Sequence, residues 1–211
     1  MHERVKVIET ALLIDDESNT TRAHREIEKA VRAILTNVGE DPHRDGLRKT
    51  PERVARMYDE LLSGYAADPV TLINDATFES DYDQMVLVRD IEFFSLCEHH
   101  LLPFFGRVHI AYLPKGKVLG LSKMPRVVEM FSRRLQIQER MTNEIAKFLD
   151  DWLHPEGVAV MVTGRHLCSM MRGVKKVNAK MVTQTFLGKF KEREMSEQLF
   201  REIYHPSGLR A

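Results

Sequence analysis

The spacing of apolar residues changes once along the chain, and this change limits the folds available to it. The stretch 21–38 has helical spacing, and its apolar residues are Ala23, Ile27, Ala30, Val31, Ile34, Leu35 and Val38. The segment "TPERVARMYDELLSG" repeats that spacing, with Thr50 as the expected N-cap, Pro51 at the first helical position and Gly64 past the end. Residues 20–64 therefore predict a helical hairpin, preceded by a polar, flexible tail.

Beyond residue 84 strand-like alternation appears. Strands are expected at 85–95, 106–114, 157–166 and 179–190, and two helices at 123–134 and 138–153. In the stretch 106–114, Val108, Ile110 and Tyr112 would share one face. The pattern predicts an α+β fold with an antiparallel sheet covered on one face. The expected organisation is a tail at 1–20, a helical part at 21–66 and a catalytic domain at 67–211.

Composition excludes several classes of protein. The chain has 211 residues, of which 43% are hydrophobic and 29% charged, and this balance argues against disorder. The formal net charge is zero, so nothing global points to nucleic acid or to an anionic membrane. No signal peptide or stretch of about 20 apolar residues is found. We therefore expect a soluble, cytoplasmic protein without a membrane partner.

The segment "CEHH" places Cys97 three positions before His100, and the second cysteine, Cys168, lies far downstream. Two buried thiols acting as small apolar groups would be the plain interpretation. The Cys-x-x-His spacing, however, is frequent in zinc sites, and Cys97, His100 and Cys168 make three ligands. Because a structural zinc site normally has four ligands, three favour an open site, in which zinc lowers the pKa of a bound water to about 7.

Two histidines remain beside these ligands. His99 adjoins His100, and His166 lies two positions before Cys168. Each is either an ordinary hydrogen-bonded histidine or, next to a metal-bound water, a general acid or base.

Cationic groups suggest a phosphate-bearing substrate. Ser122, Lys123 and Arg126 stand where a helix is expected to begin, and free backbone N–H groups there favour phosphate. Arg172 follows Cys168 by four positions. The further lysines are Lys175, Lys176, Lys180 and Lys189, and a solvated basic face would also explain them.

These motifs together resemble the GTP cyclohydrolase I family. The similarity is carried by "GLRKTPERVARMY", "SLCEHHLLPFFGRVHIAYLP", "GLSKMPRVVE", "LQIQERMT" and "HLCSMMRGV", from about residue 22 to about residue 203. The resemblance implies hydrolytic opening of the imidazole ring of GTP, release of formate and formation of 7,8-dihydroneopterin triphosphate. This is the first step of pterin biosynthesis, leading to folate or to tetrahydrobiopterin.

The resemblance also implies a fold and an assembly. The fold would be the tunnelling fold, an antiparallel sheet with two helices on one face, here preceded by the helical hairpin. The assembly would be a homodecamer of two pentamers with active sites between subunits, with one zinc ion per subunit.

Roles can be carried over residue by residue. The resemblance implies Cys97, His100 and Cys168 as zinc ligands, His99 and His166 as catalytic histidines, Gln138 and Glu139 as the guanine-binding pair, Ser122, Lys123, Arg126 and Arg172 as ribose and triphosphate contacts, and Arg53 as a triphosphate contact from a neighbouring subunit. Chemically, a carboxylate at Glu139 can accept from both N1–H and the exocyclic amine of guanine.

The chain departs from the family pattern at Pro125, at Leu135 and at the pair Gly164–Arg165. Two other interpretations remain. A related tunnelling-fold enzyme acting on another purine-like substrate would share the acidic residue that binds the base. A catalytically silent zinc-stabilised module could use its lysines on RNA, although the absence of a fourth ligand and the zero net charge argue against it.

Overall fold

The protein is described by a computed structural model that covers residues 17–204. The chain divides into two compact units, one ending at Tyr65 and the other beginning at Ala66. We describe each unit by itself.

The first unit is a pair of packed helices. It comprises α1 (Glu17–Asn37), α2 (Thr50–Leu61) and the short 3-10 helix η1 (Ser63–Tyr65). His24 on α1 and Asp59 on α2 are joined at 2.7 Å between Nε2 and Oδ2. The predicted helical hairpin is thus confirmed.

The ends of this hairpin differ from expectation in two places. Thr50 is not the N-cap: Lys49 holds that position without a side-chain capping bond, and Thr50 is the first helical residue. The Thr50 hydroxyl points back to the Gly46 carbonyl oxygen at 3.5 Å, because residues 44–49 already form a tight turn that presents that carbonyl. Helix α1 begins within the stretch assigned to the flexible tail, and residues 1–16 lie outside the described residues.

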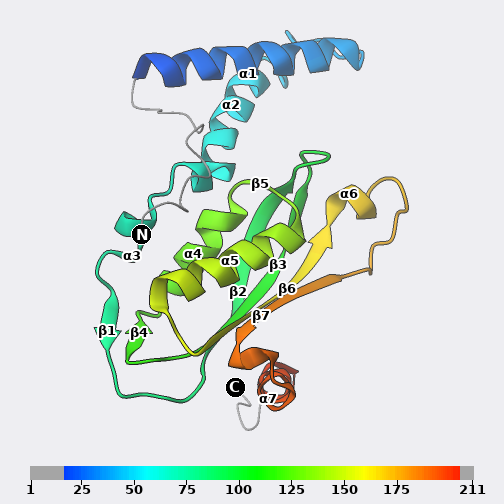
Figure 1. Cartoon of the computed structure of the whole chain (residues 1–211). Coiled ribbons are helices and arrows are strands. Elements are labelled where there is room, and N and C mark those ends of the chain that lie inside the picture. The colour runs from blue at the N-terminus through cyan, green and yellow to red at the C-terminus, as the bar shows by residue number, and fades with distance from the viewer. Residues whose placement is uncertain (1–16, 205–211) are drawn as a thin grey trace. The chain divides into compact units, whose positions relative to one another are not determined.

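The second unit is built on a five-stranded sheet (Figure 1). Its elements are α3 (Pro69–Ile73), β1 (Thr77–Glu79), β2 (Val86–Cys97), β3 (Pro103–Leu113), β4 (Lys117–Leu119), α4 (Lys123–Ser132), β5 (Leu135–Gln136), α5 (Gln138–Leu153), β6 (Gly157–His166), α6 (Leu167–Met170), β7 (Met181–Gly188), the 3-10 helix η2 (Lys189–Lys191) and α7 (Arg193–Tyr204). The order is β5-β2-β3-β6-β7. The four long strands pair antiparallel, while the two-residue β5 runs parallel to β2.

Helices α4 and α5 cover one face of this sheet (Figure 1). The alternation predicted for β3 is confirmed, because Val108, Ile110 and Tyr112 are all buried against the helices. They pack in one core with Val127 of α4 and Ile145 of α5. Burying each such side chain stabilises the fold by about 1.5–3 kcal/mol, so this face holds the sheet and the helices together. The predicted α+β fold with two helices on one face is confirmed.

The opposite face of the sheet is only partly covered. Ala111 and Leu113 of β3, together with Ala159 of β6, are buried against Phe190 of η2 and Leu199 of α7. The sequence patterns had not indicated α7. Toward the other end of the strands this face carries polar and aromatic side chains.

A second, two-stranded sheet joins β1 to β4. It is attached to the main sheet through the buried Tyr112, whose hydroxyl oxygen accepts a hydrogen bond from the Leu119 N–H at 3.1 Å. Burial raises the pKa of Tyr112, so the hydroxyl stays neutral. Strand β4 leads into the start of α4, and Tyr112 therefore helps to fix that start. Within residues 17–204, no helix combines the length and apolar character needed to span a membrane.

Candidate metal centre and active site

Cys97, His100 and Cys168 come together at one end of the main sheet. Cys97 ends β2 and begins a tight turn, in which the N–H groups of His100 and Leu101 donate to the Cys97 carbonyl at 3.2 and 2.8 Å. Cys168 lies on α6, directly after β6, and the pairing of Phe104 with His166 places α6 beside that turn. The donor atoms of the three ligands lie within 4.8 Å of one another, so this cluster could hold a metal ion.

The chemistry of this cluster fits zinc. Two thiols and one imidazole are donors that zinc prefers, and bond lengths of about 2.0–2.3 Å in a tetrahedral site separate such donors by roughly 3.5 Å. The Cys97 Sγ and His100 Nδ1 atoms are 3.9 Å apart, so a small closing movement satisfies this distance. Burial, together with the neighbouring Cys97 thiol, raises the pKa of Cys168. A bound cation would favour the thiolate instead.

Arg172 and His99 lie at the edge of this cluster. The Arg172 guanidinium contacts His100, with Nη1 and Nε2 3.2 Å apart. His99 is largely exposed, and its Nδ1 is 3.9 Å from the Cys97 Sγ. His99 is not part of the three-donor cluster found among residues 17–204. It therefore lies next to the ligands, with its ring largely exposed.

Glu98, the remaining residue of the "CEHH" segment, ties the turn to helix α5. Its carboxylate pairs with Arg140, and this hydrogen bond holds the pKa of Glu98 below its usual value. The Glu98 N–H donates to the Gln136 carbonyl at 3.1 Å, and the Gln136 side chain accepts from Arg140 at 2.9 Å. Strand β5 pairs with the end of β2 in register Cys97 with Gln136. The start of α5 is thus held beside the metal ligands.

His166 is half-buried on the helix-covered side of β6. Its ring stacks on Phe104 with 4.6 Å between centroids and 5° between planes. Its Nε2 lies 3.0 Å from Gln138 Oε1, and because an amide oxygen only accepts, Nε2 carries the proton. Burial lowers the pKa of His166, and the charge of Glu139 partly opposes this effect. The imidazole is therefore held in one tautomer and one orientation.

Gln138 is fully buried, and its side chain is already engaged within the chain. Its Nε2 lies within hydrogen-bond distance of Val162 O (3.2 Å), Met181 O (3.1 Å) and Thr183 Oγ1 (3.0 Å). With Oε1 directed at His166, both polar atoms of the side-chain amide already have partners within the chain. The assignment of Gln138 to guanine stays a prediction, while the observed contacts make it a support for His166.

The other predicted substrate contacts lie in different surroundings. Glu139 is exposed in the first turn of α5. Ser122 and Arg126 are exposed at the start of α4, whereas Lys123 is buried and donates to the Leu72 carbonyl at 2.9 Å. No hydrogen bond or ion pair within residues 17–204 connects this group to the metal cluster. Arg53 is exposed on α2, in the other unit.

Three residues of this region were not found from the sequence. Arg140 connects Glu98 to Gln136, and the hydroxyls of Thr142 and Thr183 are 2.7 Å apart next to Gln138. Arg140 carries no local sequence signal, because Gln136 belongs to β5 and Glu98 to the turn after β2, whereas Arg140 is on α5. Thr142 and Thr183 carry no such signal, because they come from separate elements.

The fold and this centre define a class of protein: an α+β tunnelling-fold chain with a Cys-His-Cys metal-binding cluster beside an acidic helix start. A profile of the family described as GTP cyclohydrolase I matches residues 27–205. The chain belongs to this family.

Two relatives carry the name of this family. A protein of Leptospira biflexa named GTP cyclohydrolase 1 is 51% identical over 177 residues, covering 84% of this chain and 97% of the relative. A protein of Campylobacter concisus with the same name is 53% identical over 180 residues, covering 85% and 95%. Among solved structures, the apo crystal structure of an archaeosine synthase QueF-like protein matches with a TM-score of 0.41 and 17% identity, covering 52% of this chain and 97% of that one.

Proposed function

We propose that the protein acts as a GTP cyclohydrolase I. It opens the imidazole ring of GTP by hydrolysis, releases C8 as formate and recloses the product as 7,8-dihydroneopterin triphosphate, the first step of folate or pterin biosynthesis. One observation carries this proposal: the donors of Cys97, His100 and Cys168 meet within 4.8 Å beside the first turn of α5, which bears Glu139. The relatives that share about half of its residues carry the name of this enzyme.

The metal in this proposal is one zinc ion per chain, held by the three donors of the cluster. Three protein ligands leave one position of a tetrahedral ion open. When bound, zinc supplies Lewis acidity that brings the pKa of a coordinated water from about 15.7 to about 7. The turn that carries two of these ligands is held in place by Glu98 and Arg140.

The base would be recognised by Glu139. An exposed carboxylate at a helix start can accept hydrogen bonds from both N1–H and the exocyclic amine of guanine.

Proton transfer would be carried out by His99 and His166. Because the Nε2–H of His166 is committed to Gln138 Oε1, Nδ1 is the nitrogen left to take up or release a proton.

The triphosphate would be bound by cations from several elements. Arg172 already lies at the edge of the metal cluster, 3.2 Å from His100. Ser122, Lys123 and Arg126 surround the start of α4, where the Lys123 ammonium donates one of its three N–H groups to the Leu72 carbonyl. The remaining contact would be Arg53 from a neighbouring subunit.

The proposed assembly is a homodecamer of two pentamers. Strand β7 is an edge of the described sheet and therefore has one side open for pairing with another chain. We place the catalytic domain at 67–211, after a helical part that ends at residue 66 and begins with α1 at Glu17, not at residue 21. Because the formal net charge is zero, we propose no nucleic-acid or membrane partner. The proposed location is the cytoplasm.

The decisive experiment incubates the purified, zinc-loaded protein with GTP. Formate and a fluorescent pterin after oxidation are the expected products. ATP serves as the matched control, because adenine has an amine where guanine has a carbonyl and its N1 has no proton. Each unpaired polar group costs about 1–3 kcal/mol, so ATP should be turned over at least tenfold more slowly, as an order of magnitude. Absence of formate from GTP, or equal turnover of ATP, would contradict the proposal.

A further inference from the structure

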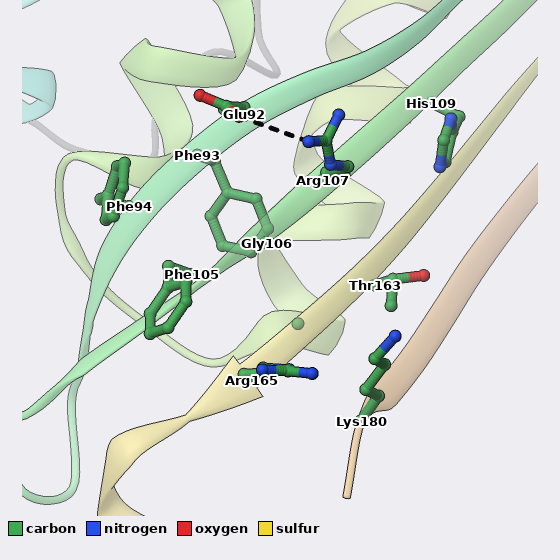
Figure 2. A pocket seen from close by; sticks show the side chains of 11 residues that line it. Glu92, Phe93, Phe94, Phe105, Gly106, Arg107, His109, Thr163, Arg165 and Lys180 are labelled. Atoms are coloured by element: carbon green, nitrogen blue, oxygen red, sulfur yellow. Dashed lines mark hydrogen bonds and ion pairs between the residues drawn. The ribbon is translucent and has the colours of Figure 1, made fainter. Parts of the chain in front are cut away.

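One face of the main five-stranded sheet is covered by α4 and α5. The opposite face, where η2 and α7 leave it uncovered, contains a pocket of about 450 Å3 that the proposed reaction does not use (Figure 2). Strands β2, β3 and β6 and the segment before β7 all contribute to it. The lining residues on which the argument depends are Glu92, Phe94, Phe105, Arg107, Arg165 and Lys180. A volume of this size is within the range of small-molecule sites and exceeds what a bare inorganic anion fills.

This pocket and the candidate active site lie on opposite faces of the sheet. Side chains alternate along a strand, so Phe104 points into the helix-covered core and Phe105 points away from it. The same alternation separates His166, which stacks on Phe104, from Arg165, whose strand partner is Phe105. Occupation of the pocket is therefore a separate event from binding at the metal cluster.

The pocket carries an excess of positive charge. Arg165 and Lys180 are exposed and have no hydrogen-bond or ion-pair partner within the described part of the chain. Arg107 lies 3.5 Å from Glu92 and 3.4 Å from Asp90, so its charge is largely compensated. Because Arg107 is paired with these carboxylates, the uncompensated cations that line the pocket are Arg165 and Lys180.

His109 does not add to this charge. Burial lowers the pKa of its imidazole, and its Nδ1 accepts from the Asp90 N–H at 3.3 Å. The charged neighbours that act on it are Asp90, Arg89 and Arg107. The positive charge of the pocket is therefore carried by arginine and lysine side chains alone.

An aromatic surface lies beside these cations. Phe94 and Phe105 stack across β2 and β3, with 5.8 Å between centroids and 23° between planes. Phe94 is 61% exposed, although an aromatic side chain of this size is usually buried. A planar ring placed on Phe94 would remove this surface from water, and such base–aromatic stacking contributes substantially to affinity.

We propose that this pocket binds a planar heterocycle carrying a phosphomonoester, with the ring on Phe94 and the phosphate between Arg165 and Lys180. A phosphomonoester has a charge of about −1.5 to −2 at pH 7, which matches the two uncompensated cations better than a single carboxylate does. The fork of Arg165 suits two phosphate oxygens, and Lys180 acts as a point charge. The simplest member of this ligand class is a nucleoside monophosphate.

Calorimetric titration of the full chain with AMP tests the proposal. Adenosine lacks the phosphate and ribose 5-phosphate lacks the ring, so each should bind about tenfold more weakly than AMP or worse. AMP without measurable binding at millimolar concentration would overturn the proposal, as would adenosine or ribose 5-phosphate binding as tightly as AMP.

Variants locate the site. Arg165→Gln with Lys180→Gln should weaken AMP binding about a hundredfold, and Phe94→Ala should weaken AMP but not ribose 5-phosphate. Lys115→Gln is the matched control, because this exposed lysine lies beyond the other end of β3 and should have no effect. Glu139→Gln should also leave AMP binding unchanged. If only Glu139→Gln weakened AMP, or if the pocket variants did not, the ligand would bind elsewhere and the proposal would fail. Thermal unfolding checks that each variant folds. If the double variant does not fold, AMP binding by Arg165→Gln alone and by Lys180→Gln alone decides the matter.

Discussion

Replacing Gln138 with leucine tests whether this residue supports His166 or binds guanine with its side chain. The amide has two N–H groups and one carbonyl oxygen, so at most about three good hydrogen bonds disappear, each with a net value of about 1 kcal/mol. Leucine is close in volume to glutamine, so no large cavity is added. We expect the free energy of unfolding to fall by about 3 kcal/mol, measured as a shift of the denaturant midpoint.

The kinetic consequence separates the two roles. Without an acceptor for its Nε2–H, His166 loses its fixed tautomer and orientation, and general acid–base groups contribute about 10²–10⁴-fold to rates. Partial loss of this contribution should lower kcat for GTP by about tenfold to a hundredfold, with little change in KM. Bound zinc should stay near the wild-type amount, because Gln138 contacts none of the three ligands among the described hydrogen bonds.

Thr183→Val is the matched control for this experiment. It removes the hydroxyl that contacts Gln138 at 3.0 Å and Thr142 at 2.7 Å, and no hydrogen bond within residues 17–204 joins it to His166. It should therefore lower stability by about 1–2 kcal/mol and leave kcat nearly unchanged. A Gln138→Leu protein with raised KM and normal kcat would refute the support role and favour guanine binding. If Thr183→Val lost as much kcat as Gln138→Leu, the cause would be looser packing around Gln138, and the support role of its hydrogen bond to His166 would be refuted.

The remaining predictions concern the metal, the histidines, the assembly and the fold. Cys168→Ser should lose zinc and turnover together, and full activity in a verified metal-free preparation would contradict the zinc site. His99→Ala and His166→Ala should each lose about 10²–10⁴-fold in turnover while metal analysis still finds about one zinc per chain; loss of zinc would make them ligands. Mixed subunits of Arg53→Ala and His99→Ala should recover part of the activity, whereas no recovery would place Arg53 in its own subunit's site. Tyr112→Phe should destabilise the fold by about 1–3 kcal/mol in denaturant titrations, because a buried N–H loses its acceptor.

Local periodicity was sufficient to predict the four long strands and the helices α1, α2, α4 and α5, but it did not indicate α7. The predicted strand 157–166 coincides with β6, and the predicted helix 138–153 coincides with α5. Helix α5 packs its apolar side against the main core, while β6 is apolar on both faces, with Val160 in that core and Ala159 in the one opposite. The strand β5 could not be found in this way, because two residues are too short to show a period. It exists because its register with the end of β2 is fixed by tertiary contacts.

The metal cluster was easier to foresee than its support. Cys97 and His100 lie in one tight turn, so their proximity is a local property of the sequence. The contacts of Gln138 depend instead on backbone carbonyls of β6 and β7, which no local pattern connects to the start of α5. The sequence thus indicated which chemical groups are present, while the hydrogen bonds decided which of them remain available to a ligand.

The neighbouring residues Gly164 and Arg165 act on opposite faces of the sheet. A Cβ atom at Gly164 would lie 2.2 Å from Gln138 Oε1, closer than any real contact allows. The absent side chain therefore leaves the space in which Gln138 reaches His166. Arg165, one position later, points to the opposite face and supplies an uncompensated cation to the pocket. A substitution that adds a side chain at Gly164 should therefore disturb the Gln138–His166 contact in the candidate active site. A substitution at Arg165 should change ligand binding in the pocket, so the two positions test the two sites separately.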